Sequence, residues 1–205
     1  MLRRPQPSKQ GGMDGDKETG VEQKSWEAGA ALSQRKQPPK QPNPPKGHRP
    51  HFTKGYGVDR KATEGILPWS FVTERMASSR NYWVATTRPD GRPHAAPVWG
   101  LWFEDRFYFG TDPRSVKGRN LGKNPSMMVH LESGDEVVIL EGAAGLLDDP
   151  PLLRRLVDEY DAKYKVRPAG FYYMDVSKAF AWREKDFTTS ATRWVFKETK
   201  RRSSR

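Results

Sequence analysis

The stretch that decides the fold begins with Asn81-Tyr-Trp-Val-Ala-Thr-Thr87 and continues into Arg88-Pro-Asp-Gly91. Its first part is rich in aromatic and β-branched residues, which favour a strand. In the second part, proline fixes one backbone dihedral of a turn and glycine accepts a positive φ. The chain then returns through the apolar residues 93–103, so the sequence predicts a β-hairpin. Pro97 removes a backbone donor from the returning strand, which indicates an edge or a bulge at that point.

The elements on either side of this hairpin favour a closed or nearly closed barrel. We expect a short helix at 67–79, strands at 106–110, 126–132, 136–146, 171–183 and 189–197, and helices after residue 111 and at 150–165. The near-continuous apolar run of 136–146 predicts burial on both faces of that strand. Short antiparallel strands with few helices indicate a mainly β (α+β) fold and argue against a doubly wound sheet.

The chain divides by composition into a folded part and two polar ends. Only 35% of its 205 residues are hydrophobic, and its net charge of +11 is concentrated near the termini. Residues 1–60 are rich in proline, glutamine and lysine, so we expect a disordered basic leader, serving as a tether or as a passive extension. The folded domain is expected at 65–197, followed by a basic tail at 198–205.

Several classes of chemistry find no support in the sequence. There is no cysteine, so disulfides and thiolate chemistry are excluded. The four histidines show no metal-ligand spacing, and we see no nucleophilic constellation and no paired acid and base. No apolar run reaches membrane-spanning length and no secretory signal is visible, so we expect no membrane partner and a cytoplasmic location.

A candidate anion site lies in Thr111-Asp-Pro-Arg-Ser-Val-Lys-Gly-Arg-Asn-Leu-Gly-Lys-Asn-Pro125. The threonine or the aspartate can cap a helix whose first turn holds the proline, and the Gly, Asn and Pro at the other end stop it. Four side chains are then expected near the helix start: Arg114, Ser115, Lys117 and Arg119. Backbone N–H groups and the helix dipole favour an anion there, and the hydroxyl and basic groups suit a phosphate ester. A basic, solvated helix is the alternative interpretation.

An ordered set of motifs joins this site to the hairpin. The motifs are Asn81-Tyr-Trp-Val-Ala-Thr, Asp90-Gly-Arg-Pro-His, Pro97-Val-Trp, Phe107-Tyr-Phe-Gly-Thr, Ser115-Val-Lys, Asn120-Leu and Asn124-Pro. Together they resemble the pyridoxamine 5′-phosphate oxidase-like family, which includes flavin- and deazaflavin-dependent oxidoreductases. The resemblance covers about residues 65–197. It implies a split β-barrel of the FMN-binding kind with a few peripheral helices, a homodimer, and FMN or the deazaflavin coenzyme F-420 in the groove between subunits.

The resemblance also implies roles for individual residues. It places the cofactor phosphate at Ser115 and Lys117, with Arg114 and Arg119 nearby. It places the ring against the segment from His94 to Trp99, and the remaining cofactor contacts it implies or allows are Pro97, Val98, Trp99, Thr111 and Trp194. His94 is a candidate donor to a ring carbonyl or to substrate, and a structural histidine is the alternative. Trp182 and Arg193 are, like Trp194, candidates from the C-terminal strands, with a place in the barrel core or a dimer contact as the alternative for these residues. At most one of Tyr172 and Tyr173 can face a substrate, because adjacent strand residues point to opposite faces.

Two departures from the family pattern restrict the function. Val116 stands where the pyridoxine-oxidising members carry arginine, and 192–196 lacks their C-terminal Arg/His signature. We therefore expect an oxidoreductase that transfers hydride to or from a small organic molecule other than pyridoxamine phosphate. A non-enzymatic flavin, haem or tetrapyrrole binder is the alternative. A nucleic-acid-binding protein would explain the net charge, but the domain shows no interleaved basic and aromatic surface, so we expect no nucleic-acid partner.

Overall fold

The computed structural model describes residues 43–196. Its elements are η1 (Lys54–Tyr56), α2 (Trp69–Ser78), β1 (Asn81–Thr87), β2 (Pro93–Phe103), β3 (Arg106–Phe109), α3 (Val116–Lys123), β4 (Ser126–His130), β5 (Glu136–Leu146), α4 (Pro150–Tyr164), β6 (Tyr172–Arg183), η2 (Glu184–Asp186), α5 (Phe187–Ser190) and β7 (Thr192–Val195). Among these residues, no helix is both long enough and apolar enough to cross a membrane.

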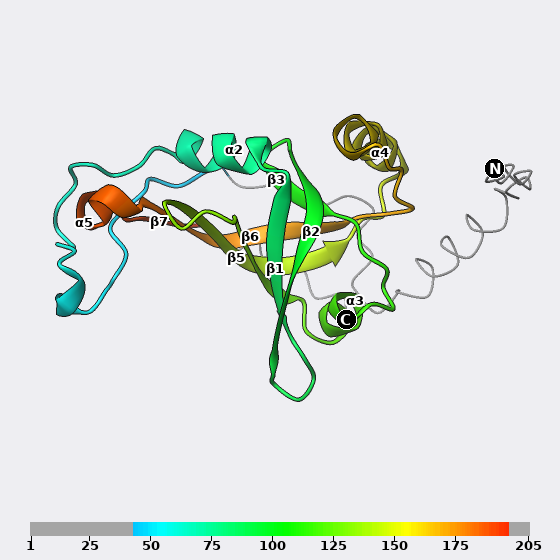
Figure 1. Cartoon of the computed structure of the whole chain (residues 1–205), viewed down its shortest axis with the longest axis horizontal. Helices are drawn as coiled ribbons and strands as arrows, with labels where there is room; N and C mark the ends of the chain where they lie inside the picture. Colours follow the sequence, from blue (N-terminus) through cyan, green and yellow to red (C-terminus); the bar gives the residue numbers. More distant parts are fainter. Residues whose placement is uncertain (1–42, 197–205) are drawn as a thin grey trace, which may run out of the picture.

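The strands form one antiparallel sheet that closes on itself. Its order is β3-β2-β1-β4-β5-β6-β7, and a further pairing of β3 with β6 closes β1–β6 into a six-stranded barrel. β7 lies outside this ring, along β6 (Figure 1). The expected fold class, a mainly β split barrel with a few peripheral helices, is confirmed.

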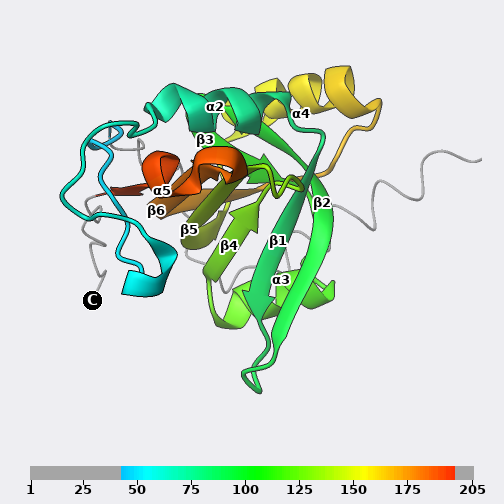
Figure 2. The same cartoon turned by 60° about the vertical axis from the view of Figure 1, so that its left-hand side comes forward.

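The β1–β2 hairpin has the bounds that the sequence predicts and leaves part of one edge unpaired. Its register runs from Asn81 opposite Trp99 to Thr87 opposite Pro93. β2 pairs with β3 only from Gly100 onward. Within the described chain, residues 93–99 therefore have no partner strand on their second side, and Pro97 lies in this edge as expected. In Figures 1 and 2, α3 lies beside the end of the hairpin that bears the turn, and α2 lies at the other end.

Two apolar clusters hold the barrel together. The larger one fills the interior and includes Val84, Val98 and Phe107. The smaller one packs α4 onto the outside of the sheet through Leu156 and Tyr160. The adjacent residues Tyr172 and Tyr173 are both buried but belong to different clusters, because successive strand residues point to opposite faces.

Two expectations about the later strands are wrong. β5 is not buried on both faces throughout, since burial alternates at 136–140, is intermediate at 141–143 and becomes continuous only at 144–146. One face of this barrel strand points outward, and apolar side chains are common on protein surfaces. The predicted strand 189–197 is shortened to β7, because η2 and α5 form the connection from β6.

The segment 43–60 is folded, which corrects the expected boundary of the disordered leader. The backbone N–H of His48 donates to the carbonyl of Arg193 at 3.0 Å, and the N–H of Arg193 donates back at 2.8 Å. Arg49 is only 5% exposed and donates to the carbonyl oxygens of Ala191, at 2.8 Å, and of Glu64. The expectations for residues 1–42 and for the basic tail fall outside the described residues.

Candidate functional site

The start of α3 is built by a serine cap. The hydroxyl of Ser115 accepts a hydrogen bond from the backbone N–H of Gly118 at 3.1 Å and lies 3.2 Å from the hydroxyl of Thr111. The expectation that Thr111 or Asp112 caps a helix whose first turn includes Pro113 is wrong. The Asp112 carboxylate accepts instead from the backbone N–H of Arg114 at 2.7 Å, so it closes a tight turn before the helix begins.

The turn that Asp112 closes packs against α3 at Gly118. A Cβ atom on Gly118 would lie 2.4 Å from the carbonyl oxygen of Pro113 and 2.6 Å from that of Asp112. Real Cβ atoms do not approach oxygen that closely, so only glycine fits here without movement of the loop. Sequence reasoning overlooked Gly118, although an isolated glycine inside a predicted helix signals a close approach.

A buried amide fastens α3 to the hairpin. Asn120 is 3% exposed, and its Nδ2 donates to the hydroxyl of Thr86 in β1 at 2.9 Å. Thr86 lies opposite His94 in the register of β1 and β2. The first turns of α3 and the N-terminal end of β2 are therefore held side by side, and Lys117 lies close enough to His94 for its charge to add to the effect of burial in lowering the pKa of that histidine.

Lys117 differs from the other basic groups at the start of α3. Its side chain is half-buried, burial lowers its pKa, and no hydrogen bond or ion pair joins its ammonium to any residue of 43–196. In contrast, exposed Arg114 pairs with Asp112 at 2.9 Å. Arg119 is also exposed, and its Nη1 donates to the carbonyl oxygen of Arg114 at 2.5 Å. A desolvated, unpaired ammonium beside a helix start favours an anion.

His94 presents an unsatisfied nitrogen at the same place. Its Nδ1 is buried and has no hydrogen-bond partner. Burial lowers the pKa of His94, and the nearby positive charges of Arg88 and Lys117 lower it further. The imidazole is therefore neutral around pH 7 and can donate or accept a proton in a hydrogen bond to a ligand.

The residues from Pro97 to Trp99 do not share a face. Val98 is in the barrel interior, whereas Pro97 and Trp99 are exposed, in keeping with the two-residue period of a strand. Their side chains cannot line one side of the same ring, although the unpaired backbone edge of 93–99 remains open. Trp99 is 40% exposed and stacks on Tyr164 with the ring centroids 5.0 Å apart.

The three candidates from the C-terminal part of the chain do not lie at the start of α3. Trp194 is 1% exposed and packs edge-to-face against Trp69 in the main core, with 5.4 Å between ring centroids. Trp182 packs edge-to-face against Phe187 at 5.8 Å. The Nη2 of Arg193 lies 2.9 Å from the Nε2 of His48. These contacts involve the protein's own side chains, and none of them reaches the start of α3.

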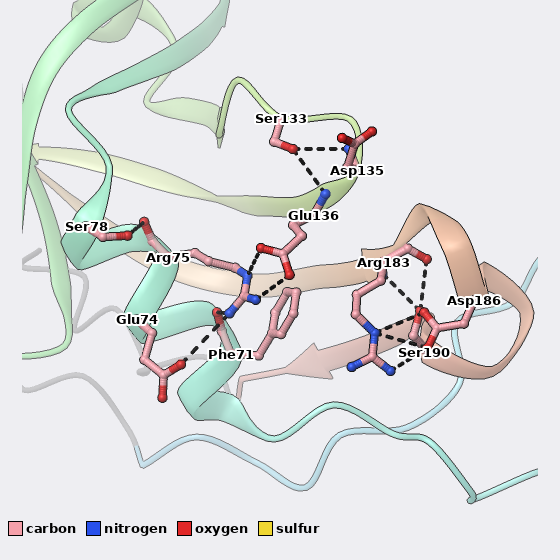
Figure 3. Close-up of polar contacts among 10 residues, drawn as sticks. All are labelled: Phe71, Glu74, Arg75, Ser78, Ser133, Asp135, Glu136, Arg183, Asp186 and Ser190. Carbon is pink, nitrogen blue, oxygen red and sulfur yellow. Dashed lines mark hydrogen bonds and ion pairs between the residues drawn. The ribbon is translucent and has the colours of Figure 1, made fainter.

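A pocket of about 250 Å³ opens between α2 and the turn that joins β4 to β5. Arg75 lines it and donates to both carboxylate oxygens of Glu136, at 2.6 and 3.1 Å (Figure 3). The guanidinium of Arg75 also lies 3.4 Å from the centroid of the Phe71 ring. Ser133 accepts hydrogen bonds from the backbone N–H groups of Asp135 and Glu136. The polar groups here satisfy one another, so the network ties α2 to β5.

The closed antiparallel barrel, with a capped basic helix beside its first hairpin, defines a split-barrel protein with a candidate anion site. Residues 71–191 match the family described as pyridoxamine 5′-phosphate oxidase, and the chain belongs to this family. No curated protein is similar enough to the sequence to count as a match.

Solved structures share the fold at low sequence identity. A conserved hypothetical protein of Mycobacterium tuberculosis is 21% identical, with a TM-score of 0.54 over 61% of this chain and 90% of that one. A pyridoxamine 5′-phosphate oxidase-related, FMN-binding protein of Nostoc punctiforme is 16% identical, with a TM-score of 0.47 over 65% and 93%. A haem-binding protein of Mycobacterium smegmatis is 18% identical, with a TM-score of 0.45 over 57% and 55%. At these identities the likeness concerns the fold alone.

Proposed function

We propose that this protein is an oxidoreductase that binds a phosphate-bearing flavin or deazaflavin and transfers hydride to or from a small organic substrate. The observation that carries the proposal is the half-buried, unpaired ammonium of Lys117 beside the Ser115 cap. A phosphate ester would neutralise this charge and accept hydrogen bonds from the first turn of α3. Membership of the pyridoxamine 5′-phosphate oxidase family supports the choice of cofactor.

The residues of the site suit both the phosphate and the planar ring of such a cofactor. Lys117 and the hydroxyl of Thr111 would hold the phosphate, and the orphaned Nδ1 of His94 would bond to an oxygen of the ligand. The unpaired edge of β2, residues 93–99, offers backbone groups to the polar edge of a planar ring. The bound cofactor supplies the hydride chemistry, and the protein contributes position and exclusion of water.

We further propose that the active form is a homodimer, as the family resemblance implies. The exposed Trp99 and the unpaired backbone of residues 93–99 are the surfaces on which a second copy would complete the ring site. Sedimentation equilibrium of the cofactor-loaded protein should give twice the chain mass. A monomer that retains the cofactor would contradict this part of the proposal.

The first experiment is a titration of the full-length protein with FMN and, separately, with coenzyme F-420, followed by fluorescence. We expect one of the two to bind, and Lys117→Met to weaken it by about tenfold or more, because the phosphate loses its charged donor. Lys123→Ala is the matched control, since Lys123 lies at the exposed end of the same helix. An unchanged affinity in the Lys117 variant would remove Lys117 from the site.

A turnover assay then separates the enzyme from a carrier. The loaded protein should exchange hydride with a small acceptor at a rate that depends on acceptor concentration. Binding without turnover of any acceptor would favour the non-enzymatic interpretation. Tight binding of haemin with no binding of FMN or coenzyme F-420 would overturn the proposed cofactor.

A further inference from the structure

One face of the β1–β2 hairpin turns basic where it passes α3. Thr86 and His94 lie opposite each other, and Thr87 and Pro93 form the next and last pair of the register. Just beyond it, the backbone N–H of Arg88 donates to the carbonyl oxygen of Arg92 at 2.9 Å. Because the side-chain period of a strand is two, Arg88 lies on the same face as Thr86. The hydroxyl of Thr86 contacts Asn120 of α3, so this face is the one directed at the helix. Figure 2 shows the hairpin running past α3.

Two cations on this face form no ion pair within residues 43–196. The Asp90 carboxylate, whose pKa is lowered first by its hydrogen bonds to Arg92, also feels the charge of Arg88. Arg92 is exposed and pairs with Asp90 at 2.7 Å. Arg88 is only partly exposed, and its guanidinium has no hydrogen bond or ion pair with any residue in the described part of the chain. Lys117 approaches from the helix and is likewise unpaired. His94 feels both positive charges, and its Nδ1 is buried without a partner.

We propose that Arg88, His94 and Lys117 form one site for a dianionic phosphate or sulfate group, and that His94 takes up a proton when the dianion binds. This inference rests on the proposed function, because the phosphate of the cofactor is the first dianion expected to occupy the site. A phosphate carried by the substrate has the same chemistry. Arg88 supplies a planar, two-pronged donor and Lys117 a point charge, a combination suited to the tetrahedral oxygens of a phosphate.

The proton uptake follows from the charges around His94. Other charged groups on the hairpin and near the start of α3 are the paired Asp90–Arg92 and Asp112–Arg114 and the exposed Arg119, and Lys123 lies at the far end of the helix. Without a ligand, burial lowers the pKa of His94, and the charges of Arg88 and Lys117 lower it further. A dianion between the two cations reverses the effect of their charges and favours the imidazolium, which donates from both nitrogens. Binding therefore strengthens as the pH falls.

Three probes separate the possible sources of the dianion. The full-length protein is titrated with FMN, with riboflavin, which lacks the phosphate, and with inorganic sulfate. Arg88→Met should weaken FMN and sulfate by about fivefold or more and leave riboflavin unchanged. Arg92→Met is the matched control, because Arg92 is exposed and already paired. Far-ultraviolet circular dichroism establishes that each variant is folded.

The outcomes distinguish this inference from the proposed function. If Lys117→Met weakens FMN but Arg88→Met changes neither FMN nor sulfate, the three-residue site is overturned and the proposed function stands. If Arg88→Met weakens sulfate but not FMN, the dianion site holds and its occupant is another phosphate. If neither FMN nor coenzyme F-420 binds while sulfate binding depends on Arg88, the site stands and the proposed cofactor falls.

A pH series with sulfate tests the proton uptake, because sulfate keeps its double charge where phosphate titrates. Affinity should rise by about fivefold between about pH 8 and about pH 6 in the natural protein. His94→Gln should remove most of this dependence while keeping a donor at the position. The same affinity at all pH values in the natural protein would overturn the proton uptake.

Discussion

The side-chain amide of Asn120 donates a 2.9 Å hydrogen bond to the hydroxyl of Thr86, and this contact joins the phosphate-site helix to the first hairpin of the barrel. Both residues are buried, so water does not compete for the bond. Thr86 lies opposite His94, and Asn120 is one turn beyond Lys117. The bond therefore holds the two halves of the candidate site together.

Replacing Asn120 with alanine should destabilise the protein and loosen the site. The buried hydroxyl of Thr86 loses its donor, so we expect the free energy of unfolding to fall by about 1–3 kcal/mol. Chemical denaturation measures this change, and FMN or coenzyme F-420 titration measures the accompanying loss of affinity. Lys123→Ala, on the exposed end of the same helix, should change neither quantity appreciably. An equal effect in both variants would show that the bond has no special role.

Two glycines of α3 should respond in opposite directions to alanine. At Gly118 the new Cβ meets the carbonyl oxygens of Pro113 and Asp112, so the loop must move and the protein should lose both stability and anion affinity. At Gly122 a Cβ would have no neighbouring atom within 4 Å, and alanine favours a helix over glycine by up to about 1 kcal/mol. Thermal unfolding should give a lower midpoint for Gly118→Ala and an equal or higher one for Gly122→Ala. A higher midpoint for Gly118→Ala would contradict the close approach.

Much of the barrel could be predicted from local patterns. The turn signal at Arg88-Pro-Asp-Gly91 lies between two strands that the structure reproduces, and Gly91 adopts the positive φ that the signal predicts. The helix expected at 150–165 also begins at its predicted residue, Pro150, directly after the cap Asp149. These features are encoded within a few residues of one another, so a single sequence is enough to reveal them.

The site was less predictable because it depends on contacts distant in sequence. The sequence favours Thr111 or Asp112 as the cap of α3, whereas the structure has Ser115 at this position, after a loop that packs on Gly118. Trp194 has the size and polarity of a ring-binding residue, but Trp69 encloses it in the core. From the sequence alone, Arg88 belongs to a turn. It becomes part of a basic cluster only because α3 lies beside the hairpin.

The segment 43–60 should contribute to the stability of the domain despite its polar composition. Arg49 is enclosed and holds two backbone carbonyls, and His48 extends the pairing of β7 through two backbone hydrogen bonds. We compare a chain that begins at residue 43 with one that begins at residue 61. The shorter chain should unfold at a clearly lower temperature, because it exposes part of the core around β7 and loses these bonds. Equal midpoints would show that the segment is dispensable.

The last prediction concerns Lys163, whose ammonium is half-buried at the end of α4. It donates to the carbonyl oxygens of Ser79 and Gly100, at 2.5 and 3.2 Å, and to the hydroxyl of Tyr82 at 3.1 Å. Burial, and then the charge of Arg80, lowers the pKa of Lys163 from 10.5 to about 8. The folded protein therefore releases this proton at a lower pH than the unfolded chain does.

The sign of the resulting pH dependence follows directly. Between about pH 8 and pH 10.5 the unfolded chain binds more protons at Lys163 than the folded protein, so this residue makes the free energy of unfolding rise with pH. Below that window both states are protonated and the contribution is constant. Lys163→Met removes the titration, so the stability difference between the natural protein and the variant should be flat up to about pH 8. Above it the difference should shift in favour of the natural protein. Urea unfolding across this range measures the difference, and a constant value would place the pKa of Lys163 at its ordinary position.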